Sequence, residues 1–104
     1  MIHLLKNLFG GNSEDFRALI RDGAQVIDVR SKDEFRGGHL KGSTNIPLPE
    51  LSRQLSKINK QKAVIVCCAS GMRSGSAKNL LASKGYTVYN GGGWSSLERK
   101  LKPS

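Results

Sequence analysis

A short strand, a tight loop and a helix follow one another between residues 63 and 84, and this order constrains the fold more than any other part of the sequence. Residues 63–66 form an apolar, β-branched run, whereas residues 74–84 carry apolar side chains at helical spacing. The loop between them opens with two adjacent cysteines. Ligands bind at the carboxyl ends of strands in parallel α/β sheets, so this loop is the first candidate site.

The rest of the chain repeats the alternation of strands and helices. Strands are expected at residues 25–29, 43–46 and 86–89, and helices after a cap at Asn12 or Ser13, after a capping box of Ser31 and Glu34, along Leu48, Leu51, Leu55 and Ile58, and along Trp94, Leu97 and Leu101. This order predicts a three-layer α/β fold, with helices on both faces of a central, mainly parallel sheet of about four to five strands. The three glycines at residues 91–93 are expected to bring the backbone close to a neighbouring segment.

The chain length of 104 residues fits a single domain with one modest core. We expect residues 1–12 to form an N-terminal arm or strand and residues 13–101 to form the core. No stretch approaches the roughly 20 apolar residues of a membrane span, and we therefore expect a cytoplasmic protein without one.

The net charge of +9 is unevenly distributed along the chain. Residues 1–50 contain seven basic and seven acidic residues, whereas residues 51–104 contain ten basic residues and Glu98 as their one acid. A basic half of this kind attracts small anions and acidic protein partners. Nucleic acid is not favoured as a partner, because the basic residues are dispersed and no aromatic platform accompanies them.

The two cysteines, Cys67 and Cys68, match neither a C-x-x-C pair nor a zinc site, so no metal and no cofactor are expected. A disulfide between neighbours would be strained, which favours free thiols in a reducing compartment. A thiol at the start of the loop would face backbone N–H groups and the positive end of the next helix, and both favour a thiolate. Gly71 gives the loop its backbone freedom, and Arg73 offers a fixed charge that binds an oxyanion or holds the loop.

A second candidate pair, Asp28 and Arg30, ends the strand expected at residues 25–29. The two residues form either a structural ion pair or a supporting part of the site, since strand ends of this kind meet at one edge of a parallel sheet.

Several motifs, in the same order and with matching spacing, resemble the rhodanese (thiosulfate sulfurtransferase-like) domain. Residues 26–30, 34–35, 38–40 and 42–47 are similar to its front half, residues 68–74 to its active-site loop, usually C-R-S-G-x-R-S, and residues 85–86, 88–89 and 92–94 to its closing segment. The resemblance covers residues 13–101.

The resemblance implies that Cys68 is the nucleophile, because Gly71 and Arg73 stand at the family's offsets from Cys68 and not from Cys67. Cys67 then takes the last strand position and is expected to be buried. The implied substrate-binding loop consists of Ala69, Ser70, Gly71, Met72, Arg73 and Ser74, with Asp28 and Arg30 in support.

The implied activity is that of a sulfurtransferase, in which Cys68 takes sulfur from a donor such as thiosulfate, carries it as a persulfide and passes it to a thiol or to cyanide. Such chemistry requires loop amides that point at the sulfur and a thiol that solvent can reach.

Two departures from the family pattern bear on this expectation. Ala69 stands where many members have Arg, which removes a charge that could hold thiosulfate, and Leu97 stands where Trp is frequent.

Two other functions stay open from the sequence. One is a cysteine phosphatase or arsenate reductase, whose C-x5-R loop would start at Cys67. The other is a non-catalytic interaction module, although such modules typically lose the loop cysteine.

Overall fold

The protein has an α/β fold with a parallel β-sheet at its centre. A computed structural model describes residues 15–103, and the expected N-terminal arm lies outside them. The strands are β1 (Gln25–Asp28), β2 (Thr44–Asn45), β3 (Val64–Cys68) and β4 (Val88–Gly93), in the order β2-β1-β3-β4. Each neighbouring pair is parallel. The predicted fold class is therefore confirmed for the described residues.

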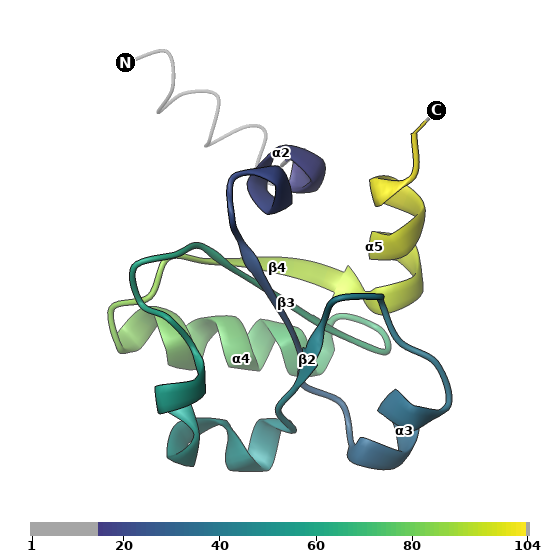
Figure 1. The fold of residues 1–104 in the computed structure, drawn as a ribbon. Helices are drawn as coiled ribbons and strands as arrows, with labels where there is room; N and C mark the ends of the chain where they lie inside the picture. The colour runs from purple at the N-terminus through teal and green to yellow at the C-terminus, as the bar shows by residue number, and fades with distance from the viewer. Residues whose placement is uncertain (1–14, 104) are drawn as a thin grey trace.

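Helices cover both faces of the sheet (Figure 1). One face is covered by α4 (Met72–Ser83) and by the 3-10 helices η1 (Leu48–Arg53) and η2 (Leu55–Lys57), and the other by α2 (Phe16–Arg21) and α5 (Trp94–Leu101). The short helix α3 (Lys32–Arg36) follows β1. No helix among residues 15–103 is long and apolar enough to cross a membrane.

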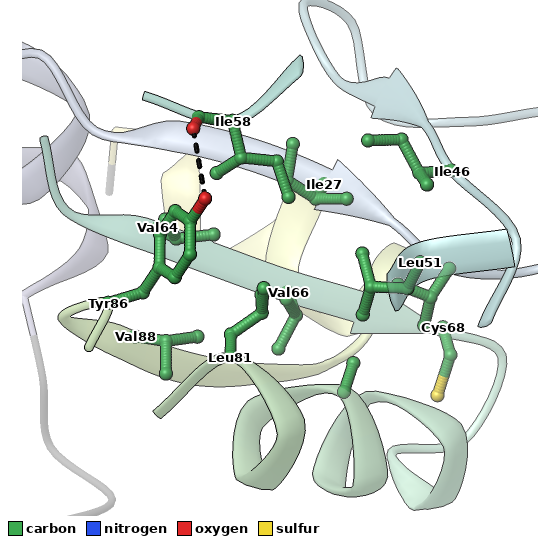
Figure 2. Close-up of a cluster of buried hydrophobic side chains, with 12 residues drawn as sticks. Ile27, Ile46, Leu51, Ile58, Val64, Val66, Cys68, Leu81, Tyr86 and Val88 are labelled. Atoms are coloured by element: carbon green, nitrogen blue, oxygen red, sulfur yellow. Dashed lines mark hydrogen bonds between the residues drawn. The ribbon is translucent and has the colours of Figure 1, made fainter. Parts of the chain in front are cut away.

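Strand β3 divides the core into two clusters, because its side chains alternate between the two faces. Val64, Val66 and Cys68 pack in the cluster on the face that α4 covers. Ile65 and Cys67 pack in the cluster on the face that α5 covers. All five residues are fully buried. Figure 2 shows the first cluster, with Cys68 at one end of the row and its sulfur directed toward the covering helix.

The short capping sequence at residues 31–34 forms as predicted. Ser31 Oγ accepts from Glu34 N, and the Glu34 carboxylate accepts from Ser31 N, so the capping box closes the start of α3. The helix α2 begins later than predicted. Its N-cap is Asp15, whose carboxylate accepts from Ala18 N, while Asn12 and Ser13 lie outside the described residues.

The prediction of one helix along residues 48–58 is wrong, since this segment forms the two short 3-10 helices. Gln54 adopts φ −120° and ψ 27°, which interrupts the helical backbone between them. The predicted apolar face nevertheless holds. Leu51 and Ile58 are buried in the core cluster that also contains Ala77 and Leu81 of α4, and Leu48 and Leu55 pack against this cluster.

The last strand extends through the glycines instead of ending at Tyr89. Val66 pairs with Asn90 and Cys67 pairs with Gly92, so Gly91 is an extra residue that forms a β-bulge. The expected close approach is found at two glycines. A Cβ atom on Gly91 would lie 3.0 Å from Ile65 and Leu97 side chains, and one on Gly93 would lie 2.7 Å from the Ala69 carbonyl oxygen.

Candidate active site

Cys68 is the last residue of β3 and lies where the loop of residues 69–71 turns into helix α4. Gly71, the N-cap of that helix, has φ +103°, a left-handed conformation that glycine adopts without strain. This turn directs the Gly71 N–H to the Cys68 sulfur at 2.9 Å, and the first turn of α4 directs the Ser74 N–H to it at 3.3 Å. The structure thus brings main-chain donors and a helix N-terminus onto one thiol.

Two opposing effects act on the acidity of Cys68. Burial raises the pKa of the thiol, but hydrogen bonding with the Ser74 side chain and with the backbone N–H groups of Ser74, Gly71 and Ser70 outweighs burial, so the pKa lies below that of an ordinary cysteine. A lower pKa increases the fraction of thiolate, which is the nucleophilic form.

The expectation that solvent reaches this thiol is wrong for the conformation described, because Cys68 has 0% of its surface exposed. The left-handed turn at Gly71 brings the loop back over the sulfur, and Ser74, itself buried, lies against it. Ala69 and Ser70 in the same loop are exposed. The segment that follows Cys68 therefore lies at the surface, even though the sulfur beneath it does not.

Cys67 has the same exposed fraction, 0%, as its neighbour, but its side chain packs in the cluster below α5. Burial raises the pKa of the Cys67 thiol to about 12, and the nearby Asp28 carboxylate adds to the rise. The predicted burial of Cys67 is confirmed. Both cysteines are free thiols.

Arg73 does not bond the sulfur, and its guanidinium is bound by Glu34. Arg73 Nη1 lies 2.7 Å from Glu34 Oε1 and Nη2 lies 3.0 Å from Oε2, a two-bond pairing of the planar fork with the carboxylate. The hydrogen bonds from Arg73 lower the pKa of the Glu34 carboxylate to about 2, and the hydrogen bond from Ser31 N makes the second-largest contribution. Of the two roles expected for Arg73, the one the structure supplies is holding the loop.

The sequence placed Glu34 in a capping box and in the rhodanese resemblance, but not among the candidate site residues. That box is the signal that could have found it, because it fixes the Glu34 carboxylate at the start of α3, where it accepts from Ser31 N and from Arg73 together.

Asp28 and Arg30 form a buried ion pair. The Arg30 Nη2–Asp28 Oδ2 distance is 2.8 Å, and the side chains are 5% and 0% exposed. Arg30 also donates to the Gly38 carbonyl oxygen at 2.7 Å and lies 5.0 Å from the centre of the Trp94 ring. The pair thereby braces the segment that carries Glu34, rather than presenting a charge at the thiol.

Asn90 contacts the loop from strand β4 and was not among the predicted site residues. Its Oδ1 accepts from Ser74 Oγ at 2.7 Å and from Gly92 N at 2.9 Å, and its Nδ2 donates to the Gly71 carbonyl oxygen at 3.4 Å. Met72, on the outer side of the same turn, is 81% exposed. No spacing rule in the sequence links Asn90 to the loop, since the contact depends on the pairing of β4 with β3.

Among the residues that the structure describes, no group of three His, Cys, Asp or Glu side chains could hold a metal ion.

The fold and the site define a class of protein: a small parallel α/β domain whose candidate nucleophile is a cysteine at the carboxyl edge of the sheet. The family model for the rhodanese-like domain matches residues 12–100. The chain belongs to the rhodanese-like domain family.

Curated relatives and solved structures agree with this assignment. The chain is 43% identical over 91 residues to the uncharacterized protein YqhL of Bacillus subtilis, and the matched region covers 86% of this chain and 71% of that protein. It is 40% identical over 70 residues to the thiosulfate sulfurtransferase PspE of Escherichia coli, and here the matched region covers 64% of this chain and 67% of that protein. The solved structure of a rhodanese with anions from E. coli is 38% identical, has a TM-score of 0.66 and covers 71% of this chain and 91% of that one.

Proposed function

We propose that the protein is a sulfurtransferase that carries sulfane sulfur as a persulfide on Cys68. The observation that carries this proposal is the convergence of the Gly71 and Ser74 N–H groups on the Cys68 sulfur. Main-chain donors of this kind stabilise an anionic sulfur without requiring a histidine base. The family and a relative named thiosulfate sulfurtransferase support the same chemistry.

In the first step the Cys68 thiolate attacks the outer sulfur of thiosulfate. The S–S bond of the donor breaks, sulfite leaves with the bonding electron pair, and Cys68 becomes a persulfide whose terminal sulfur carries the negative charge. In the second step a thiolate or cyanide attacks that terminal sulfur, and the Cys68 thiolate is released. Each step transfers one sulfur atom between nucleophiles, so no further oxidant or reductant is needed.

Both steps require the loop over Cys68 to open, because the sulfur has no exposed surface. The exposed Ala69 and Ser70 are the residues that move most readily, since their side chains contribute little to the buried core. Arg73, held by Glu34, anchors the helical end of the loop during this movement.

The charge of the chain is consistent with anionic partners. A net charge of +9 favours a small anionic sulfur donor and, as an acceptor, the thiol of an acidic protein partner. A carrier of this kind needs its thiol in the reduced form, and we propose a reducing compartment such as the cytoplasm.

The phosphatase-type alternative has no support from the geometry. It needs Cys67 as the nucleophile, but the Cys67 side chain packs on the opposite face of the sheet from Ser74 and Ala77, and its pKa is raised to about 12. The interaction module gains no specific observation over the sulfurtransferase.

Mass spectrometry of the intact protein tests the proposal. Incubation with thiosulfate is expected to add the mass of one sulfur atom, located by peptide mapping on Cys68 and removed by cyanide. Cys68→Ser should abolish the adduct and the transfer of sulfur to cyanide, whereas Cys67→Ser should retain most of both. Absence of the adduct with thiosulfate, mercaptopyruvate and a persulfide donor would overturn the proposal.

A further inference from the structure

The Ser74 hydroxyl lies between two possible partners and has one proton for them. Its Oγ atom is 3.3 Å from the Cys68 sulfur and 2.7 Å from Asn90 Oδ1. A hydroxyl donates a single hydrogen bond, so Ser74 cannot donate to both atoms at once. In the arrangement described, Ser74 donates to Asn90 and accepts the S–H of a neutral Cys68.

The orientation of the Asn90 amide is fixed by its other contacts. The Gly92 N–H donates to Oδ1 at 2.9 Å, and the Gly71 carbonyl oxygen lies 3.4 Å from Nδ2. A flipped amide would place its NH₂ group against the Gly92 N–H and its oxygen against a carbonyl. Asn90 therefore presents an acceptor to Ser74.

We propose that Asn90 is a positioning residue that competes with the Cys68 sulfur for the Ser74 hydroxyl proton. The inference rests on the proposed sulfur chemistry only for its functional meaning, because the competition itself concerns the free thiol.

Two hydrogen-bond states follow from this competition. When Cys68 is neutral, its S–H donates to Ser74 Oγ and the Ser74 hydroxyl donates to Asn90. When Cys68 loses its proton to water, Ser74 Oγ has no donor on that side, and its hydroxyl turns to the thiolate. Asn90 Oδ1 retains the Gly92 N–H in the second state, so no polar atom is left without a partner. The same rearrangement applies to the anionic persulfide.

The charged groups around the sulfur are the same in both states. Arg73 on α4 is bound by Glu34 on α3, and Asp28 at the end of β1 is bound by Arg30, which also donates to the Gly38 carbonyl oxygen. The Cys67 thiol points into the opposite cluster. From β4 and the first turn of α4, the groups that change partner are the neutral side chains of Asn90 and Ser74.

The competition predicts shifts of opposite sign for two substitutions. Ser74→Ala removes a donor to the thiolate and should raise the pKa of Cys68. Asn90→Ala releases the hydroxyl to the thiolate and should lower it. A shift of about half to one unit in either direction corresponds to about a three- to tenfold change in the thiolate fraction below the pKa. In the double variant Ser74→Ala/Asn90→Ala, the effect of Asn90→Ala should disappear, because there is no hydroxyl left to release.

The experiment measures the pH midpoint of Cys68 alkylation by iodoacetamide, which needs no sulfur donor. Cys67→Ala serves as the background, so that one thiol reports, and Asn79→Ala, an exposed residue of helix α4, is the matched control with no expected shift. Opposite shifts for the two single variants, with the loss of the Asn90→Ala effect in the double variant, support the inference. Shifts of the same sign, or additive shifts, overturn it.

A second variant keeps the test decisive if Asn90→Ala does not fold. Asn90→Asp has nearly the same shape and a stronger acceptor, so it should hold the Ser74 hydroxyl and raise the midpoint. The rise should be smaller when Ser74→Ala is also present, and an equal rise in both backgrounds would contradict the competition. If these shifts are observed but no persulfide forms with any donor, the proposed function fails while the hydrogen-bond inference stands. The reverse result removes the inference alone.

Discussion

Cys67 and Cys68 are adjacent in the sequence and have the same exposed fraction, 0%, but the structure gives them different chemistry. Strand alternation turns Cys67 into the apolar cluster below α5, where burial raises its pKa to about 12. Cys68 points toward the start of α4, where donors from Gly71 and Ser74 lower its pKa.

The contrast shows that burial alone does not decide whether a thiol is reactive. Burial raises the pKa at both positions, and the difference arises from the hydrogen-bond donors that only one position receives. Cys68 faces such donors because it ends β3 and α4 begins shortly after it. The four predictions that follow are ordered from the largest expected effect to the smallest.

The largest expected effect is selective alkylation of the two thiols. At pH 7, a thiol with a pKa of about 12 is ionised to about one part in 10⁵, so Cys67 should remain unmodified in the folded protein while Cys68 reacts. We expect a rate difference of at least about a hundredfold, measured by peptide mass spectrometry over time. In denaturant the two rates should converge. Equal rates in the folded protein would contradict the contrast.

Two glycine substitutions should separate the two faces of the sheet. Gly91→Ala places a methyl group 3.0 Å from Ile65 and Leu97, in the cluster of Cys67, and should cost about 1 to 3 kcal/mol of unfolding free energy in urea denaturation. Gly93→Ala places one 2.7 Å from the Ala69 carbonyl oxygen and should displace the loop instead.

The second variant should therefore change the rate of Cys68 alkylation more than the first, because Ala69 belongs to the loop over Cys68 whereas Gly91 contacts the opposite cluster. Each variant is the control for the other. If both lost the same property to the same extent, the two faces would not be separable in this way.

Removal of the Arg73 guanidinium should loosen the loop on the Cys68 side. Arg73→Ala is expected to reduce the rate of persulfide formation about tenfold, because the charge-assisted pairing with Glu34 that holds the first turn of α4 is lost. Stopped-flow kinetics with thiosulfate measures the rate. Arg36→Ala, which removes an exposed ion pair with Asp33, is the control with little expected change. An unchanged rate in Arg73→Ala would remove the anchoring role.

The smallest expected effect is a loss of this pairing in acid. The pKa of Glu34 falls from 4.5 to about 2 in the folded protein, so its stabilisation is complete above pH 4.5 and is lost as the pH falls toward 2. The stability difference between the wild type and Glu34→Gln should shrink across that range. Urea denaturation at a series of pH values measures the difference, and a difference independent of pH would show that the ion pair is not its source.

Much of the fold followed from local sequence signals. The capping box at Ser31 and the apolar runs that became β1 and β3 were each predicted from a few neighbouring residues. The error at residues 48–58 has a local cause as well. Apolar spacing located the buried Leu51 and Ile58 correctly, but a repeat of three or four residues does not distinguish an α-helix from two 3-10 helices around a break at Gln54.

The candidate site was predictable to a different degree. The offset of Gly71 from Cys68 is a short-range property of the chain, and the backbone freedom expected of Gly71 is used in a left-handed turn whose N–H donates to the thiol. The covering of the sulfur was not predictable, because it depends on how tightly the loop closes against Gly93 of the neighbouring strand.

The sequence by itself determined the alternation of strands and helices and the position of a cysteine at the strand-to-helix turn, since both depend on side-chain periodicity and on residues within one turn of each other. Only the tertiary structure decided which partners reach that turn. Glu34 binds Arg73 from 39 residues away, and Asn90 binds Ser74 from 16 residues away. Such contacts arise when the sheet brings separate loops to one edge, and no local pattern encodes a contact between residues so far apart in the sequence.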